Sequence, residues 1–314
     1  MPMSYYSRLS KSFENVPRLP LNHCTKYVLF SDCHRGVGTT NDNFLKNQNL
    51  YYAALQHYYR TGYTYIELGD GDELWENRSM KQIIEAHGDV FSLLSLFHRQ
   101  GRLYMLYGNH DMIKKDIRYT VRNCSTYPCC CGSNPYLERQ PLLPDIRFYP
   151  GIILENTLDP DFQNVYLTHG HQADFFNSVL WRFSRFLVRY LWKPLEHYGV
   201  LDPTSAARNY TKKQKTEQLL HRWAEQEHHI LITGHTHRPA LSGTDTCYYN
   251  CGSCVHPYSI TCLELEYMHI RLVKWALAAD SDMHLYVARE VLSESVPLSS
   301  TAPQASAMAQ NISI

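Results

Sequence analysis

Side chains that bind divalent cations follow five short apolar segments of this chain. Two of them, Asp32 and His34, lie two residues apart directly after the apolar segment KYVLFS, so both can turn toward one ion. The complete set is Asp32, His34, Asp70, Asn109, His169, His235 and His237. Carboxylate and amide oxygens combined with imidazole nitrogens make a mixed site that suits Mn, Fe or Zn. If one carboxylate bridges two such ions about 3.5–4 Å apart, the pair can clamp the attacking and leaving oxygens of an in-line displacement at phosphorus.

Each of these residues also has an ordinary structural interpretation. A single Asp or His at the end of a strand can cap a helix or form a buried hydrogen bond. Two features favour a shared site. One is the recurrence of such residues at five strand ends, and the other is the sequence Gly69-Asp70-Gly71, whose glycines let a ligand approach the backbone closely.

The positions of these residues depend on an alternation of short strands and helices. Apolar runs and helical periodicity predict strands over 26–31, 65–68, 102–107, 165–168 and 230–233, and helices over 44–60 and 79–99. The β-α-β-α-β order of the first half indicates an α/β fold with a mostly parallel sheet. Such sheets bind their ligands at the carboxyl ends of the strands, which is where the candidate residues stand.

Between the last two of these strands the pattern becomes helical. Apolar residues recur there at helical spacing, and arginines stand between them, whereas this stretch contains no acidic residue. The apolar residues are Phe176, Leu180, Phe183, Leu187 and Leu191, and the arginines are Arg182, Arg185 and Arg189. We interpret residues 172–229 as a helical insertion that forms a lid over the site, although a helix packed on the domain with its arginines in water has the same pattern. The predicted organisation is an N-terminal extension over 1–24, one domain over 25–290 and a flexible C-terminal tail over 291–314.

Composition and charge exclude several classes of protein. The 314 residues include 30 basic and 30 acidic ones, so no nucleic-acid partner is expected from a global electrostatic attraction. The first residues lack the basic and apolar regions of a signal peptide, and no apolar run approaches the roughly 20 residues of a membrane span. We therefore expect a cytoplasmic protein whose ten cysteines are mostly free thiols. A structural zinc site among the cysteines of 124–131 or 247–254 is the alternative.

Five motifs, taken in order, resemble the motif set of the calcineurin-like metallophosphoesterases over roughly residues 25 to 275. They are Asp32-x-His34, Gly69-Asp70-x-x-Glu73, Gly108-Asn109-His110-Asp111, His169 and Gly234-His235-Thr236-His237. The resemblance implies a four-layer α/β/β/α sandwich that binds two divalent metal ions. It assigns one ion to Asp32, His34, Asp70 and His237, and the other to Asp70, Asn109, His169 and His235.

The same resemblance implies roles for the remaining motif residues. A hydroxide bridging the two metals would be the nucleophile, because a bound cation lowers the pKa of water toward neutrality. His110 would protonate the leaving-group oxygen, and Glu73, which stands where family members often carry Asp, would orient His110. Arg35, His171 and Arg238 adjoin the motifs and are candidates for substrate binding.

The sequence indicates the substrate less closely than it indicates the metal ligands. The chain also resembles the bacterial UDP-diacylglucosamine pyrophosphohydrolases, through Glu73 with Trp75 nearby, the sequence from Gly234 to Ala240 and the helical insertion. It departs from them at His110, where they typically carry Arg, and at His171, where they typically carry Asp. The expected function is hydrolysis of a phosphomonoester, phosphodiester or pyrophosphate bond in a phosphorylated small molecule. The alternatives are a lipid-linked nucleotide substrate, with the lid in peripheral contact with a membrane, and a non-catalytic metal-binding module.

Overall fold

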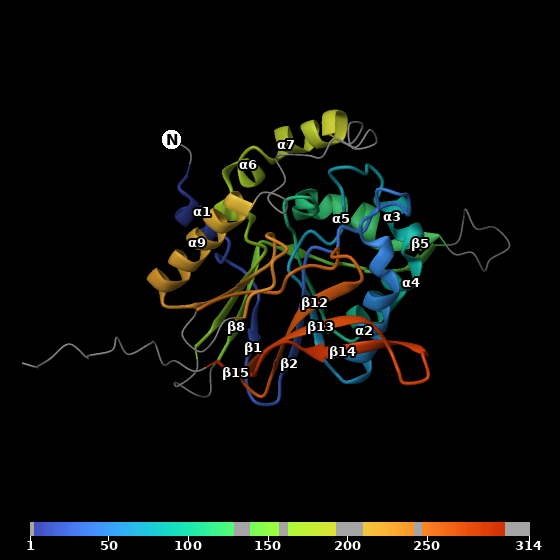
Figure 1. Cartoon of the computed structure of the whole chain (residues 1–314). Coiled ribbons are helices and arrows are strands. Elements are labelled where there is room, and N and C mark those ends of the chain that lie inside the picture. The colour runs from blue at the N-terminus through green and yellow to red at the C-terminus, as the bar shows by residue number, and fades with distance from the viewer. Residues whose placement is uncertain (1–2, 129–138, 157–162, 193–209, 242–246, 299–314) are drawn as a thin grey trace, which may run out of the picture.

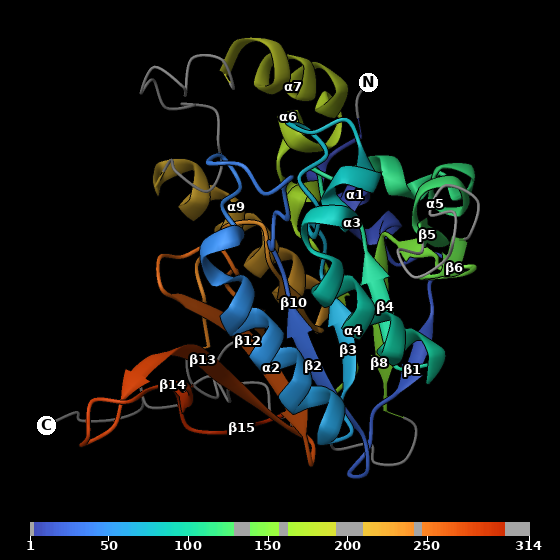
Figure 2. The same ribbon diagram turned by 90° about the vertical axis from the view of Figure 1, so that its right-hand side faces the viewer.

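Two β-sheets with helices on their outer faces make up the protein (Figure 1, Figure 2), which confirms the α/β class. The computed structural model describes residues 3–128, 139–156, 163–192, 210–241 and 247–298. Within these residues, none of the helices is long and apolar enough to cross a membrane.

The strands of the described residues fall into two large sheets and a hairpin. The first sheet has the order β1 (Arg18–Pro20), β8 (Gly151–Glu155), β9 (Val165–Thr168), β10 (Ile230–Thr233) and β11 (Tyr248–Asn250). The second has the order β14 (Leu285–Val291), β13 (His269–Ala279), β12 (Ser259–Glu266), β2 (Lys26–Phe30), β3 (Thr64–Glu67), β4 (Leu103–Leu106) and β7 (Phe148–Tyr149), with β15 (Val296–Pro297) paired to β13. The hairpin pairs β5 (Thr126–Pro128) with β6 (Arg139–Pro141).

Helices connect and cover these strands. The α-helices are α1 (Tyr5–Lys11), α2 (Gln48–Arg60), α3 (Met80–Ala86), α4 (Gly88–Arg99), α5 (Ile117–Cys124), α6 (Phe175–Ser178), α7 (Trp181–Leu187) and α9 (Tyr210–Glu227). Short helical turns are η1 (Leu45–Asn47), η2 (Met112–Lys115), η3 (His171–Ala173) and η4 (Val188–Trp192).

The sheets are mixed rather than mostly parallel. Strands β2, β3, β4 and β7 pair in parallel, as the alternation of strands and helices predicts. Strand β12 is antiparallel to both β2 and β13, and β13 is antiparallel to β14. Strands β9 and β10, which end just before His169 and His235, belong to the other sheet. The candidate ligands therefore come from two sheets that must pack together.

Apolar faces on both sides of the strands hold the layers together. In β10, Ile230 and Ile232 face the other sheet, whereas Leu231 faces α9. In β2, Leu29 packs between the sheets, and Phe30 packs under α2 and α4. Each fully buried side chain of this kind contributes about 1.5–3 kcal/mol to the free energy of unfolding. Continuous apolar strands are what a sheet covered on both faces requires.

The helix predicted over 79–99 is two helices that meet at His87. This residue has a non-helical backbone, and its buried ring contacts Asp42 at 2.9 Å and Gln48 at 2.7 Å. The contacts tie the break between α3 and α4 to the loop before α2. Periodicity alone predicts one helix, because the break depends on residues about 40 positions away.

The boundaries of the predicted domain also differ in the structure. Residues predicted as an N-terminal extension form α1, which buries Leu9, and β1, which pairs with β8. At the other end, β15 pairs with β13 and Leu298 is buried, so the folded part continues past residue 290. Residues 299–314 of the predicted tail lie outside the described residues.

The predicted lid consists of two different parts. Helix α9 buries Leu220, Trp223 and Ala224 against the first sheet, so it is an outer layer of the fold rather than part of a lid. The segment from α6 to η4 lies farther out, at the top of Figure 1. Residues 193–209 lie outside the described residues, so the described part of the predicted lid other than α9 is 172–192.

Candidate metal centre

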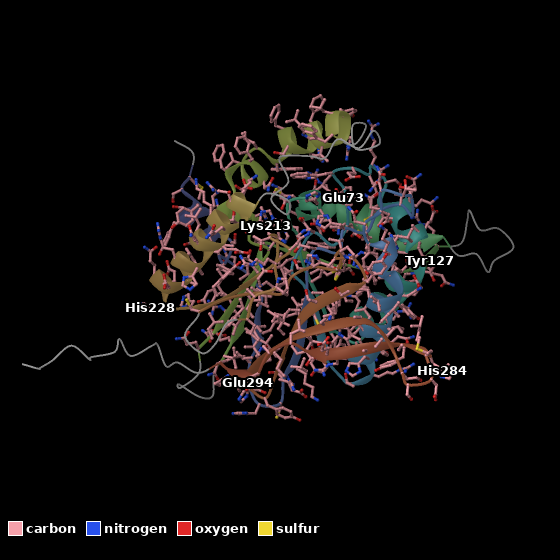
Figure 3. All side chains as sticks on the ribbon, in the orientation of Figure 1. Glu73, Tyr127, Lys213, His228, His284 and Glu294 are labelled. Atoms are coloured by element: carbon pink, nitrogen blue, oxygen red, sulfur yellow. The ribbon has the colours of Figure 1, made fainter. Side chains whose placement is uncertain are left out.

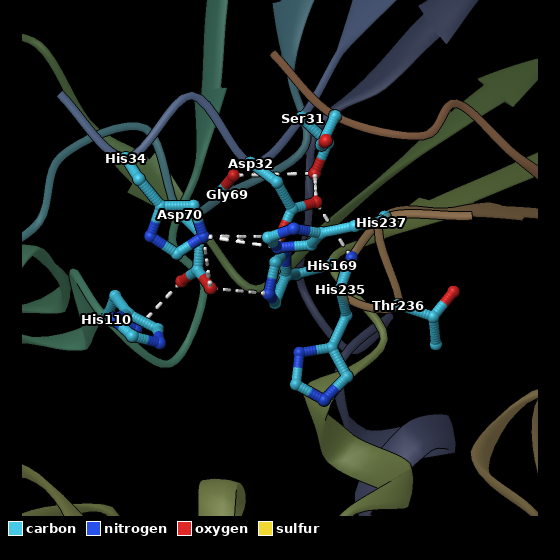
Figure 4. A network of polar contacts seen from close by, with 12 residues as sticks. Ser31, Asp32, His34, Gly69, Asp70, His110, His169, His235, Thr236 and His237 are labelled. Atoms are coloured by element: carbon cyan, nitrogen blue, oxygen red, sulfur yellow. Dashed lines mark hydrogen bonds and ion pairs between the residues drawn. The ribbon is translucent and has the colours of Figure 1, made fainter. Parts of the chain in front are cut away.

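The candidate ligands gather at the carboxyl ends of strands from both sheets. Asp32 and His34 follow β2, Asp70 follows β3 and Asn109 follows β4. His169 follows β9, and His235 and His237 follow β10. Figure 4 shows the carboxylates and imidazoles of this group turned toward one another. Three groups of side chains have ligand atoms within 4.8 Å of one another: Asp32, His34 and His237; His34, Asp70 and His110; and Asp70, His169 and His235.

The backbone at these strand ends is strained. Five of the seven candidate ligands have a left-handed backbone, with φ between 49° and 68°: Asp32, His34, Asp70, His235 and His237. For residues other than glycine this conformation costs on the order of 1–3 kcal/mol each, and it persists where the surrounding structure enforces it. Here it turns side chains two residues apart toward the same centre. Strain concentrated at one place is typical of a functional site.

Glycines in the motifs make room for the two carboxylates. A Cβ atom on Gly108 would lie 2.1 Å from Asp70 Oδ1, and one on Gly234 would lie 2.4 Å from Asp32 Oδ2. Real Cβ atoms essentially never come so close. The loops after β4 and β10 can therefore approach Asp70 and Asp32 only with glycine at these positions.

Each carboxylate is held by one oxygen and presents the other to the centre. Asp32 Oδ2 accepts hydrogen bonds from the Ser31 hydroxyl at 2.6 Å and the His235 amide at 2.8 Å. Asp70 Oδ1 accepts one from the His110 amide at 2.7 Å. The second oxygens face imidazoles: Asp32 Oδ1 lies 3.1 Å from His237 Nε2, and Asp70 Oδ2 lies 3.1 Å from His169 Nε2.

Hydrogen bonds at Nδ1 point two imidazoles toward the centre. His169 Nδ1 lies 3.0 Å from the carbonyl of Leu68, which can only accept, so this nitrogen carries the proton and Nε2 of the neutral ring has a lone pair. His34 Nδ1 likewise lies 2.8 Å from Glu73, and His34 Nε2 lies 3.3 Å from His237 Nε2. Lone pairs thus face carboxylate oxygens and one another, which is stable only with a proton or a cation between them.

These residues fit divalent metal ions. Asp32 Oδ1, Asn109 Oδ1, His169 Nε2 and His235 Nε2 are buried and have no hydrogen-bond partner among the described residues. A buried polar atom without a partner costs about 1–3 kcal/mol. Two ligands about 2.1 Å from one ion and at right angles lie about 3 Å apart, close to the separations found here. Divalent ions bound in this space would satisfy these four atoms.

The electrostatics show the same need for positive charge. Burial disfavours the charged ring of His169, but Asp70 and Asp32 outweigh it and raise the pKa of His169 to about 9. Burial also opposes the charged form of Asp32, yet His237 and His169 hold the pKa of this carboxyl well below its usual range. In the protein alone, the charged ring of His169 thus offsets part of the carboxylate charge. A bound divalent ion would take over that role, and His169 would then release its proton.

Glu73 contacts two histidines. Its carboxylate lies 2.8 Å from Nδ1 of His110, the contact expected from the sequence, and 2.8 Å from Nδ1 of His34, which was not expected. Burial opposes ionisation of Glu73, but the two rings hold its pKa well below the usual range. Trp75 stacks on His110 with ring centroids 4.2 Å apart. His110 is thus fixed at Nδ1 and on one face of its ring.

The prediction that Arg35 binds substrate is wrong. Its side chain is fully buried and pairs with Glu67 at 2.8 and 2.9 Å and with Asp72 at 2.7 Å. Lys114 joins the same network through Asp72 and through Asp111, at 2.9 Å from the latter. Because Arg35 pairs with both carboxylates and has no access to solvent, its role is structural and it does not reach a substrate. A signal was present in the sequence, because Glu67 lies inside an apolar strand and a buried charge requires a partner.

The other two candidates for substrate binding lie at the edge of the centre. His171 is buried, its ring lies 5.4 Å from that of His169, and Nδ1 has no partner among the described residues. Burial and the neighbouring His169 lower its pKa to about 3, so the ring is neutral. Arg238 follows His237, and its side chain is 56% exposed and lies 3.5 Å from Glu217. Arg238 therefore remains accessible to a ligand.

Arg189 connects the helical segment to the centre. Its guanidinium donates to the carbonyls of Trp75 at 2.8 Å and of Leu74 at 2.7 Å. These carbonyls belong to the loop that carries Glu73 and the ring stacked on His110. The sequence shows Arg189 only as one of several basic residues on a helix, because its partners lie more than 110 positions away.

The described cysteines do not support the zinc alternative. Seven are free thiols: Cys24, Cys33, Cys124, Cys247, Cys251, Cys254 and Cys262. None of these belongs to a group close enough to hold an ion. Cys129, Cys130 and Cys131 lie outside the described residues.

Comparison with known proteins identifies no family by sequence. No family model matches the chain, and no curated protein matches it. Among solved structures, the chain is similar to Vps29 from Chaetomium thermophilum, with a TM-score of 0.37 and 11% identity, over 88% of this chain and 99% of that one.

Replacing Arg35 tests its structural role. We expect Arg35→Gln to lower the free energy of unfolding by about 3–5 kcal/mol, because Glu67 and Asp72 would remain buried without their partner. Urea denaturation measures the change. The matched control, Arg238→Gln, removes an exposed cation and should alter stability by less than about 0.5 kcal/mol. Unchanged stability in Arg35→Gln with a raised KM would restore Arg35 as a substrate ligand.

Proposed function

We propose that this protein is a dinuclear metal-dependent phosphoesterase that hydrolyses a phosphomonoester, phosphodiester or pyrophosphate bond. The observation that carries the proposal is the pair of buried carboxylates, Asp32 and Asp70, each presenting one oxygen to an imidazole nitrogen at 3.1 Å, with four buried ligand atoms of the centre left without a hydrogen-bond partner among the described residues. A purely structural cluster would have paired these atoms by hydrogen bonds.

The proposed ligands divide into two sets that share Asp70. One set is Asp32, His34, Asp70 and His237, and the other is Asp70, Asn109, His169 and His235. Divalent ions held there would polarise the phosphoryl oxygen and lower the pKa of bound water toward neutrality. The N/O donors suit Mn, Fe and Zn alike.

His110 is the proposed proton donor to the leaving oxygen. Glu73 holds Nδ1, which leaves Nε2 as the nitrogen that can give a proton to a ligand. Burial lowers the pKa of His110, but Glu73 and Asp70 outweigh it and raise the pKa above its ordinary value, which favours the protonated ring that a proton donor requires. Its side chain is 22% exposed, which keeps it accessible to a substrate.

We further propose that the two sheets and their outer helices form the four-layer sandwich of the calcineurin-like metallophosphoesterases, with α6 to η4 as the lid. Arg238 and His171 are the proposed contacts to substrate. The location in the cytoplasm and the absence of a nucleic-acid partner stay predictions of the sequence.

A lipid-linked nucleotide is the second candidate substrate. It is favoured by the exposed aromatic side chains of the segment beside the centre, among them Phe183 and Phe186. Hydrolysis of a pyrophosphate bond in such a substrate requires the same metal ligands as the main proposal. A substrate panel of nucleotides, UDP-linked lipids and phosphoproteins distinguishes the two.

Removing one shared ligand tests the metal centre. We expect Asp70→Asn to lower both bound Mn²⁺ and turnover of bis-(p-nitrophenyl) phosphate by more than about 100-fold. Loss of a residue that only hydrogen-bonds to a metal ligand typically costs about 10–100-fold, and loss of the ligand itself should cost more. Elemental analysis and a colour assay on the same preparation measure the two effects. His221→Ala, on the outer helix α9, is the control and should leave both unchanged.

The results for the wild-type protein separate the proposals. Metal bound at full occupancy without turnover of any phosphate ester would favour the non-catalytic metal-binding module. Full activity in Asp70→Asn would contradict the proposed centre.

The leaving group tests the role of His110. We expect His110→Ala to slow hydrolysis of esters with poor leaving groups by about 10²–10⁴-fold, because they require protonation in the transition state. Activated aryl esters should lose about tenfold or less, since their leaving groups depart as anions. Comparison of kcat/KM for alkyl and p-nitrophenyl esters provides an internal control. An equal loss on both would remove His110 as the proton donor.

A further inference from the structure

A cavity of about 730 Å³ lies outside the candidate metal centre, among α3, α4, α5 and the hairpin of β5 and β6. Figure 1 shows α3, α4 and β5 beside one another at the right of the molecule. Figure 3 shows that Tyr127, which lines the cavity, and Glu73 of the metal centre occupy different parts of the molecule. Sites for small molecules are typically concave, with volumes of about 300–1,000 Å³. The cavity therefore has the size of a binding site, and none of its lining residues is a candidate metal ligand.

The wall of this cavity toward the interior is apolar. Ile84 on α3, Phe91 on α4 and Leu142 after the hairpin line it, and all three belong to the same hydrophobic core. Each of these side chains is at most 6% exposed, so the cavity reaches down to the core. An apolar group bound against this wall would be shielded from water, which is favourable because apolar surface is removed from solvent.

Positive charge accompanies the apolar wall. Lys81, Arg122 and Arg139 also line the cavity. Glu85, the acidic residue among the lining residues, lies 3.6 Å from Lys81, one turn away on α3. Within the described part of the chain, neither Arg122 nor Arg139 forms an ion pair with a carboxylate. A guanidinium group binds a carboxylate through two parallel hydrogen bonds, so these two arginines can receive an anion.

Gly88 leaves space in the cavity at the start of α4. It lines the cavity, and a Cβ atom added to it would meet no heavy atom within 4 Å. Its φ does not lie in the left-handed region, so the backbone does not require glycine at this position. A larger side chain here can therefore enter the cavity without backbone strain, which gives a direct way to fill it.

We propose that this cavity binds a small organic anion with an apolar body, such as an aromatic or medium-chain carboxylate. The apolar body lies against Ile84, Phe91 and Leu142, and the anionic group lies at Arg122 and Arg139. A small molecule is favoured over a protein partner because side chains of several elements converge on one cavity, whereas a stable protein interface buries about 1,200–2,000 Å² of surface. The inference goes beyond the proposed function, since none of these residues belongs to the metal centre.

Calorimetric titration of the full chain with naphthoate and with decanoate tests the proposal. We expect each carboxylate to bind at a single site and to compete with the other. Naphthalenemethanol, which has the same rings without the charge, should bind at least about tenfold more weakly, because it cannot form charged hydrogen bonds with the arginines.

The arginines are tested by substitution. Arg122→Gln/Arg139→Gln should weaken the binding of naphthoate by at least about tenfold, for the same reason. The matched control is Arg118→Gln, which lies on the same helix as Arg122, is 92% exposed and does not line the cavity. This control should leave the binding of naphthoate unchanged.

Filling the cavity locates the bound anion. Gly88→Trp should abolish the binding of naphthoate, because the indole ring occupies the space of the ligand. Gly88→Ala adds only a Cβ atom that meets no neighbour, so it should retain the binding. Urea denaturation checks that both variants are folded. Three results would overturn the proposal: no binding of either carboxylate, equal binding of naphthoate and naphthalenemethanol, and binding that a folded Gly88→Trp variant leaves unchanged.

Discussion

Lone pairs that face one another in a buried space are the central constraint of this structure. The free oxygens of Asp32 and Asp70 each lie 3.1 Å from an imidazole nitrogen, and two imidazole nitrogens approach to 3.3 Å. Such an arrangement is unstable without positive charge between the groups. The left-handed backbones and the closely approaching glycines all serve to maintain it. The free energy that these features cost is explained if binding of a cation offsets it.

Behind this centre, a buried ionic network keeps the loops in place. Arg35 and Lys114 bring their charges into the interior, where each must be paired, and Asp72 contacts both. Asp111 extends the network to the backbone amide of Gly108 at 2.7 Å, which fixes the loop that carries Asn109. Breaking such a network leaves uncompensated charge and is strongly destabilising. The network therefore supports the ligands without touching a substrate.

The sequence predicts the parts of the site that depend on local patterns. Asp32, Asp70 and Asn109 follow apolar strands, and their convergence follows from parallel pairing at one edge of a sheet. That His169 comes from a second sheet depends on how apolar faces pack, which strand periodicity does not determine. The error at Arg35 has the same origin, because its burial depends on Glu67 from a neighbouring strand. Partners distant in the chain decide what a side chain does, and a single sequence does not show them.

The shared position of Glu73 links the proposed acid to the ligands. One carboxylate holds both His34 and His110, so a shift of its loop would move a candidate metal ligand and the proposed proton donor together. The same loop carries Trp75, whose carbonyl accepts a hydrogen bond from Arg189 of the exposed helical segment. A substrate or surface that displaces this segment would therefore act on the orientation of His110 before it affects the carboxylates, which are held from the strand ends. In the proposed enzyme, such a displacement would change the selectivity among leaving groups first.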